Sequence, residues 1–428
     1  MFKIRTKMEA LMDDHEKLNR TLTMARRSLT ILEEQVAGFG ALHAPAHLKI
    51  ELEEKRRQVA ELEAKIGGES AIQANDAQVV RQEPGDPQAA APPGVDVTLL
   101  TEIVPTAFCH QLTAEAFPLV TVTLDNTGQG CTNAALRVSA AIEDYSDIAV
   151  ASSRVRQGEQ VRVSLLPILK SAAVVTLNEI QPVTLRVTVE QTTPAERTLY
   201  DQTKRIKLHA RGTALLAVKA PDGSLIDLTD YLAAWVTPRH IAIEKLLRRA
   251  AERHPDRQFV GYPSAGTLVQ SAKIVRAQAQ AIFAALKQEA SVVYVNSPLN
   301  LGKQQRQITQ RVRLPSESLT AGGSANCIDG TVLFASLLEL VSIQPLIVVV
   351  PGHAFLGWRI WRDADQYGFL ETTMIGSANF DAAQQAAQDQ YDDVLMKGYF
   401  SRGLFDPGGF ARLVDVAACR AKEIDPLE

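Results

Sequence analysis

Three residues in the last third of the chain have types and positions that could carry out covalent chemistry. The first, Cys327, follows the glycine-containing loop Gly322–Asn326 and precedes the apolar run Thr331–Leu340, which predicts a buried helix. A thiol at a helix start faces backbone N–H groups and the positive end of the helix dipole, and both favour its thiolate form. Because the thiolate is the nucleophile of covalent cysteine catalysis, Cys327 is a candidate nucleophile. Considered alone, it could equally be a small residue that only closes the helix start.

Two further candidates follow on predicted strands. His353, the only histidine C-terminal to Cys327, comes just after the apolar run Leu346–Val350, and Glu371 lies in the segment Phe369–Thr373. Each could be structural alone, but a carboxylate in a buried strand is costly unless it is paired, and a histidine is a natural partner. Cysteine, histidine and acid in this order supply a nucleophile, a base and a group that orients the base. Together they predict a catalytic site.

Attack of a thiolate on a carbonyl creates an oxyanion, which needs hydrogen-bond donors. We expect the backbone N–H of Cys327 to be the first donor, because it lies at the helix start. The second donor is expected from an upstream polar side chain, either Gln310 or Asn296, and the sequence leaves that choice open. Asp329, in the first turn of the same helix, is expected to stabilise the helix dipole rather than to act in catalysis.

The four cysteines give no sign of a metal site or a disulfide framework. Cys109, Cys131, Cys327 and Cys419 are far apart and form no CxxC pair, which the common cysteine-rich zinc sites contain. We therefore expect no metal and no cofactor, and a reducing compartment.

The segments around the three candidates predict an α+β domain over residues 211–428, in which apolar runs bracket stretches of helical spacing. Ahead of it, residues 95–210 change to a period of two, with turn residues between the runs Val120–Leu124, Val161–Leu165 and Val183–Val189. This alternation predicts an antiparallel β-sandwich of immunoglobulin-like type. Such a domain could be a spacer or a binding surface, and the sequence does not choose.

The first part of the chain predicts a tethered helical module. Leucines on a 3.6-residue period before Gly38 and a second amphipathic run after Pro45 predict a helical hairpin over residues 1–66. Residues 67–94 are rich in Pro, Gly, Gln and Ala, which predicts a flexible linker. So small a hairpin has little core of its own, so we expect it to pack against a copy of itself or a partner protein. A solvated hairpin without a partner is the alternative.

Residues 235–400 resemble the transglutaminase-like branch of the papain-like cysteine enzymes, and in particular a bacterial subfamily found in multidomain proteins. The motifs that carry the resemblance are Arg311–Glu317, Asn326–Gly330, Pro351–Phe355 and Glu371–Gly376. The resemblance implies that Cys327 is the nucleophile, His353 the general base and Glu371 the orienting acid. Transglutaminases more often have Asp at the third position, and their calcium sites have no evident counterpart in this sequence.

The N-terminal hairpin also resembles a known group, the small helical effector-associated domains of bacteria, over residues 20–66. The segments that carry this resemblance are Leu29–Gln35, Ala37–Gly40, His43–Leu48 and Glu51–Arg56. Those domains recruit effectors in defence systems through like-with-like contacts. The resemblance therefore implies a partner protein, or self-association, through residues 1–66.

Composition limits the classes of function. The chain has 45 basic and 49 acidic residues and a net charge of −4, whereas nucleic-acid binders usually carry a strongly basic face. It contains no apolar run of the roughly 18 residues that a membrane helix needs, and its N-terminus lacks the apolar core of a secretory signal. We therefore expect a cytoplasmic protein that acts on a protein or peptide, with no nucleic-acid or membrane partner.

These expectations combine into one hypothesis and two alternatives. The hypothesis is a cytosolic bacterial effector, a cysteine protease or amidase that works through a thioacyl intermediate and is recruited by its helical module. In the first alternative an amine replaces water as acceptor, and the protein is a crosslinking transglutaminase. In the second, a degenerate cleft binds protein without catalysis. Hydrolysis is favoured because nothing in the sequence marks an amine-binding site.

Overall fold

The chain divides into two compact units, Met1–Gln88 and Ala89–Glu428. The computed structural model describes residues 91–128, 132–289, 293–294, 306–320 and 324–427, and a few helical positions of the first unit, namely Leu29, Leu52, 55–57 and Val59. Nearly all of the hairpin predicted for 1–66 and of the linker predicted for 67–94 therefore lies outside the described residues. Gly94, the last residue of the predicted linker, begins the first strand.

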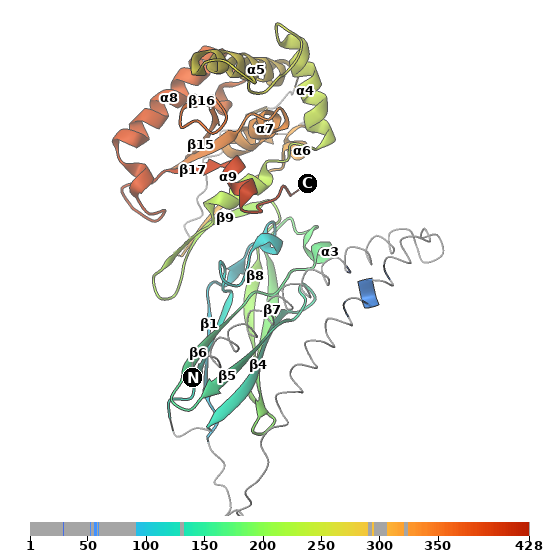
Figure 1. Cartoon of the computed structure of the whole chain (residues 1–428), viewed down its shortest axis with the longest axis vertical. Coiled ribbons are helices and arrows are strands. Elements are labelled where there is room, and N and C mark those ends of the chain that lie inside the picture. The colour runs from blue at the N-terminus through green and yellow to red at the C-terminus, as the bar shows by residue number, and fades with distance from the viewer. Residues whose placement is uncertain are drawn as a thin grey trace, which may run out of the picture. The chain divides into compact units, whose positions relative to one another are not determined.

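Residues 94–208, called here the two-sheet region, form two sheets of largely antiparallel strands (Figure 1). The smaller sheet has the order β1 (Gly94–Leu99), β3 (Val120–Asp125), β6 (Gln160–Leu165). The larger has the order β2 (Ile103–Val104), β8 (Arg197–Leu208), β7 (Gln181–Thr193), β4 (Asn133–Ile142), β5 (Ala149–Arg156), with only the β2–β8 pair parallel. The short η1 (Cys109–Gln111) and α3 (Ser171–Val174) complete the region.

Side-chain alternation produces these strands, as the sequence predicted. Along β3, Val120, Val122 and Leu124 are buried and the residues between them are partly exposed, because successive side chains of a strand point to opposite faces. Val122 pairs with Val97 of β1 and Val163 of β6. The alternating runs singled out in the sequence lie in β3, β6 and β7.

Residues 213–427, called here the α+β region, contain a four-stranded antiparallel sheet with the order β16 (Tyr367–Leu370), β15 (His353–Arg359), β14 (Pro345–Val350), β17 (Arg412–Asp415). A second antiparallel sheet has the order β10 (Leu225–Asp227), β9 (Thr213–Lys219), β12 (Gln307–Arg311). Two short strands, β11 (Val293–Tyr294) and β13 (Ser324–Ala325), pair in parallel.

The helices of this region are α4 (Ile241–Arg253), α5 (Leu268–Glu289), α6 (Pro315–Ser318), α7 (Cys327–Leu340), α8 (Phe380–Met396) and α9 (Val416–Ala421), with the 3-10 turns η2 (Thr229–Trp235), η3 (Thr372–Met374) and η4 (Tyr399–Ser401). Sheets and helices together confirm the expected multidomain, mixed α+β character of the chain. No described helix has both the length and the apolar composition to cross a membrane.

Helix α7 is the centre of the α+β region. Every residue from Cys327 to Leu338 is buried, as expected for a helix that is apolar on all sides. It packs against β14 and β15 of the sheet and against α4, α5 and α6, and Figure 1 shows the longer helices α4, α5 and α8 around it. A buried helix held on all sides gives its first residue, Cys327, a fixed position.

The two regions share one hydrophobic core rather than being joined by a free linker. The Phe108 ring of the two-sheet region stacks on Tyr231 of η2 at 4.8 Å between centroids. The Gln307 side-chain nitrogen of β12 donates to the Ile103 carbonyl at 2.9 Å.

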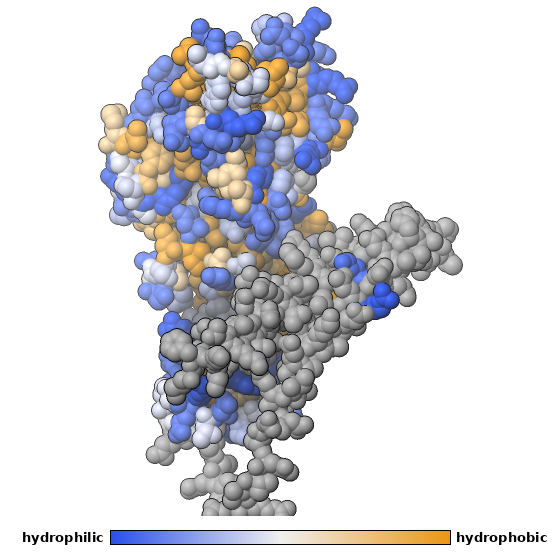
Figure 2. Space-filling view, viewed as in Figure 1, coloured by the Kyte–Doolittle hydropathy of each residue, from blue (hydrophilic) through white to orange (hydrophobic). Residues whose placement is uncertain are grey.

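Figure 2 shows that the surface facing the viewer mixes hydrophilic residues with smaller hydrophobic areas.

Candidate active site

Cys327 is the first residue of α7, and a reciprocal cap fixes the turn that precedes it. The Asn326 side-chain oxygen accepts from the Asp329 N–H at 3.0 Å, and the Asp329 carboxylate accepts from the Asn326 N–H at 3.0 Å. This capping box satisfies two of the N–H groups that a helix start leaves without partners. The predicted place of the thiol at a helix start is therefore the one observed.

The Asp329 carboxylate also accepts hydrogen bonds from the Arg313 backbone N–H at 2.8 Å and from the Arg313 guanidinium at 3.1 Å. Burial raises the pKa of its carboxyl, although the hydrogen bonds from Arg313 and Asn326 and the positive charge of Arg313 act to lower it. With its oxygens used in this way, Asp329 holds the start of α7 in place, which agrees with the structural role expected for it.

His353 and Glu371 form the predicted pair, with 2.6 Å between Nε2 and the Glu371 carboxylate. His353 begins β15, directly after a tight turn in which Gly352 has φ +74°, a conformation that favours glycine. Glu371 lies one residue beyond the end of β16, at the N-cap of η3, and not within the strand as the sequence suggested. Since β15 and β16 are neighbours in the sheet, this offset still brings the two side chains together.

The Cys327 side chain lies near the same imidazole, because it is one of the two groups that favour the protonated form of His353. Burial disfavours the charged form of His353, but the hydrogen bonds and the charges of Cys327 and Glu371 outweigh it and raise the pKa of His353 from 6.5 to about 10. At neutral pH the imidazole is therefore protonated. Because Nε2 is engaged by Glu371, Nδ1 is the nitrogen left to face the sulfur, and an imidazolium beside a thiol is the arrangement that supports thiolate nucleophiles.

Glu371 is held by more than the histidine. One carboxylate oxygen accepts from the Thr373 N–H at 3.0 Å and the Thr373 hydroxyl at 2.6 Å, and the other accepts from Gln390 of α8 at 3.4 Å as well as from His353. Burial alone would raise the pKa of Glu371, but the bond and charge of His353 and the bonds of Thr373 hold it below its usual 4.5. The carboxylate thus stays ionised, as an orienting group must.

The carbonyl of Cys327 is fixed by two threonines that sequence reasoning did not single out. Thr331, one turn along α7, donates its hydroxyl at 2.7 Å, and Thr372 donates at 3.4 Å. Because Thr372 follows Glu371 directly, the backbone of the nucleophile is joined to the segment that carries the acid. The only signal in the sequence was the pair of threonines after Glu371.

The two oxyanion candidates have different outcomes. Asn296 lies outside the described residues. Gln310, on β12, is buried, and its side-chain nitrogen donates to the Arg311 carbonyl at 2.8 Å; in the part of the chain that the structure describes, no hydrogen bond joins it to Cys327. The Cys327 N–H, at the first position of α7, has no acceptor within its helix, so it fits the first donor role.

The site is mostly buried but open at the imidazole. The His353 side chain is 26% exposed and that of Glu371 4%, while Cys327 is 6% exposed. Low exposure of the carboxylate strengthens its interaction with the imidazolium, and the imidazole is the most exposed of the three side chains. Within the described residues, no group of three or more His, Cys, Asp or Glu side chains is arranged to hold a metal ion.

Comparison of the chain with protein-family models, with curated proteins and with solved structures finds no match. The chemistry of the site therefore has to be inferred from its geometry.

Proposed function

We propose that this protein is a cysteine hydrolase that cleaves a peptide or amide bond through a thioacyl intermediate. The observation that carries the proposal is the hydrogen-bonded pair of His353 and Glu371 next to Cys327, the first residue of a buried helix. The proposal includes a transglutaminase-like fold for residues 211–428 and an immunoglobulin-like one for residues 95–210. It also includes a cytoplasmic location and recruitment through residues 1–66.

The reaction would proceed in two balanced steps. The Cys327 thiolate attacks the carbonyl carbon, and the C=O electron pair moves to oxygen, next to the Cys327 N–H. When the carbonyl re-forms, the C–N bond breaks and the amine leaves with the proton from His353. Water then attacks the thioester, His353 takes its proton, and the C–S bond breaks to release the acid and the thiolate. Glu371 stabilises the imidazolium in both steps.

Thiol reactivity gives the most direct test. Cys109 and Cys419 are buried, and burial raises the pKa of each to about 12, so both should resist alkylation in the folded chain. We expect iodoacetamide at neutral pH to label Cys327 faster than it labels free cysteine, as peptide mass spectrometry would show. Labelling of Cys327 no faster than free cysteine, with the fold intact, would argue against the proposal.

Two assays then separate hydrolysis from the alternatives. Hydrolysis predicts cleavage of casein peptides or release of ammonia from glutamine peptides, lost in Cys327→Ala. Incorporation of a fluorescent amine into the same peptides, in preference to water, would favour crosslinking. Partner binding that survives Cys327→Ala, without any turnover by the unmodified chain, would favour a scaffold.

A further inference from the structure

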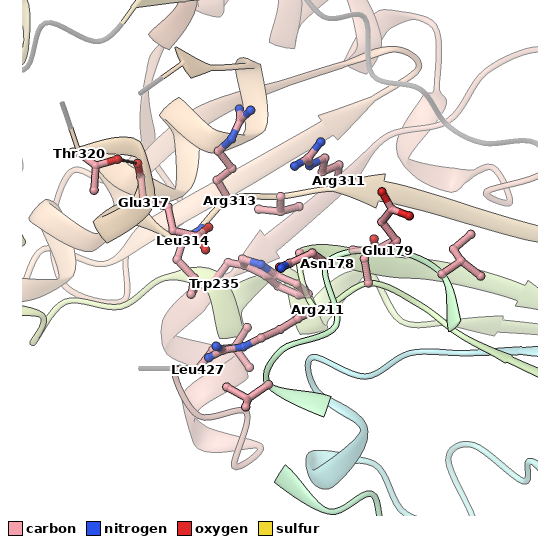
Figure 3. A pocket seen from close by; sticks show the side chains of 16 residues that line it. Asn178, Glu179, Arg211, Trp235, Arg311, Arg313, Leu314, Glu317, Thr320 and Leu427 are labelled. Atoms are coloured by element: carbon pink, nitrogen blue, oxygen red, sulfur yellow. Dashed lines mark hydrogen bonds between the residues drawn. The ribbon is translucent and has the colours of Figure 1, made fainter. Parts of the chain in front are cut away.

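A cavity of about 880 Å³ lies where the loop after α3 and the start of β9 face β12 and α6 (Figure 3). The lining includes residues that precede β9, among them Asn178, Glu179 and Arg211, and residues of the α+β region, among them Trp235 and Arg311. Its volume is in the range of small-molecule sites, and such sites often lie where two domains meet. Neither Cys327 nor His353 is among the lining residues.

Three arginines line this cavity, namely Arg211, Arg311 and Arg313. Figure 3 shows Arg311 and Arg313 extending in the same direction, with Arg211 on the other side of Trp235. Among the residues that the structure describes, the guanidinium groups of Arg211 and Arg311 have no hydrogen-bond or ion-pair partner. The unpaired guanidinium of Arg311, next to Arg313, is well suited to an oxyanion, which the planar fork binds with two parallel hydrogen bonds.

The acidic residues of the cavity narrow the class of ligand. Glu317 is committed to the start of α6, because its carboxylate accepts from the Leu314 N–H at 2.9 Å. Glu179 is exposed at the rim and would repel a densely charged anion, but it can accept hydrogen bonds from hydroxyl groups. Leu427, which is partly exposed, can cover a carbon skeleton, whereas Trp235 is buried and only supports the lining from behind.

We infer that this cavity binds a small molecule that carries one oxyanion, a phosphate or a carboxylate, together with hydroxyl groups. Arg311 and Arg313 bind the oxyanion, Arg211 contacts the far end of the ligand, and Glu179 accepts from its hydroxyls.

Arg313 connects this cavity to the start of α7. Arg313 lines the cavity, and its guanidinium binds the buried carboxylate of Asp329, which caps the helix that begins at Cys327. An oxyanion in the cavity competes with Asp329 for Arg313, so occupancy changes the alkylation rate of Cys327. This coupling rests on the proposed function, whereas the binding site does not.

Binding can be measured on the full chain by titration calorimetry with three probes. We expect saturable binding of ribose 5-phosphate, of gluconate, or of both, and none of ribose. Binding of only one of the two anions identifies the phosphate or the carboxylate as the preferred group. If neither anion saturates the protein, or if ribose binds as tightly as the anions, the site is refuted.

Variants locate the binding. Arg311→Gln should raise the Kd of whichever anion binds by about ten- to a hundredfold, because the substitution removes hydrogen bonds to a charged group. The matched control is Arg154→Gln, an exposed arginine on β5 that does not line the cavity; it should keep the Kd of the unmodified chain. Thermal unfolding midpoints verify that both variants are folded. An unchanged Kd in Arg311→Gln would refute the assignment.

The coupling has a separate readout. The iodoacetamide rate at Cys327 is measured with and without the saturating anion, and we expect it to differ at least severalfold. A bound anion that leaves this rate unchanged contradicts the coupling but supports the site. A Cys327 that is unreactive under both conditions contradicts the proposed function, while the calorimetry still decides the binding.

Discussion

The Glu371 carboxylate accepts four hydrogen bonds, and only one of them comes from His353. A buried carboxylate with this many donors is costly to neutralise, and its charge holds the imidazole protonated. His353 and Glu371, each without a distinctive signal of its own in the sequence, therefore acquire linked protonation states when the chain folds.

The pH dependence of stability should report this pair. The folded pKa of His353, about 10, lies above its ordinary 6.5, so its stabilisation is complete below pH 6.5 and is lost as the pH rises toward 10. Replacing Glu371 with Gln removes the negative charge and lowers the histidine pKa. The unfolding free energy from urea titrations should therefore fall less steeply between pH 6.5 and 8.5 in Glu371→Gln than in the unmodified chain. Equal slopes in the variant and the unmodified chain would show that Glu371 does not influence the titration of His353.

Thr373 offers a finer test of the same carboxylate. Thr373→Val removes the 2.6 Å hydroxyl bond to Glu371 but keeps the backbone N–H bond, so Cys327 alkylation at neutral pH should slow by about tenfold. Thr127→Val is the matched control, since Thr127 donates its hydroxyl to Asp125 at 2.6 Å in the same local turn, in the two-sheet region. A control that slows alkylation as much as Thr373→Val would contradict the positioning role.

At the scale of elements, the start of α7 depends on a segment that lies outside the helix. Arg313, between β12 and α6, donates its backbone N–H and its guanidinium to Asp329, so the segment that joins β12 to α6 is tied to the start of α7 at one buried carboxylate. The cap thereby fixes the direction in which α7 leaves the turn and, with it, the position of the thiol.

Asp329→Asn should destabilise the fold by about 3 kcal/mol, because it leaves a partly buried guanidinium without its counter-charge. The control is Asp381→Asn, which breaks the ion pair of Asp381 with Arg276 where the carboxylate is 74% exposed; exposed pairs contribute less than about 1 kcal/mol. Urea unfolding of both variants measures the difference. A similar loss of unfolding free energy in both variants would mean that burial does not strengthen the ion pair of Asp329 with Arg313.

The sequence predicted the parts of this site that depend on local signals. The apolar run after Cys327 predicted α7, and the order of Cys327, His353 and Glu371 predicted a set that the fold does bring together. Gln390 and the contact of Arg313 with Asp329 were missed because they depend on how α8 and the segment after β12 approach the site. Arg313 lies in the motif Arg311–Glu317, but the motif does not indicate which residue it contacts. Glu371 was placed in a strand because apolar neighbours do not distinguish a strand from the residue that follows it.

At the scale of the whole molecule, the two-sheet and α+β regions share a core that includes Phe108 and Tyr231. The sequence predicted a boundary at residues 210/211, and the loop between β8 and β9 lies there. Periodicity marks where one kind of element gives way to another, but it does not report whether the two sides are packed together. Their packing makes the two-sheet region part of the body that carries the site, and the chain divides instead after Gln88.

Removal of residues 1–88 therefore provides the test at this scale, because the cut follows the division between the two compact units. If the first unit serves recruitment alone, the shortened chain should label Cys327 with iodoacetamide at the rate of the full chain. Self-association or partner capture, measured by sedimentation and by pull-down, should be lost at the same time. A full chain that sediments only as a monomer and captures no partner would contradict a recruiting role for residues 1–66. A large change of the labelling rate on truncation would show instead that the first unit acts on the thiol itself.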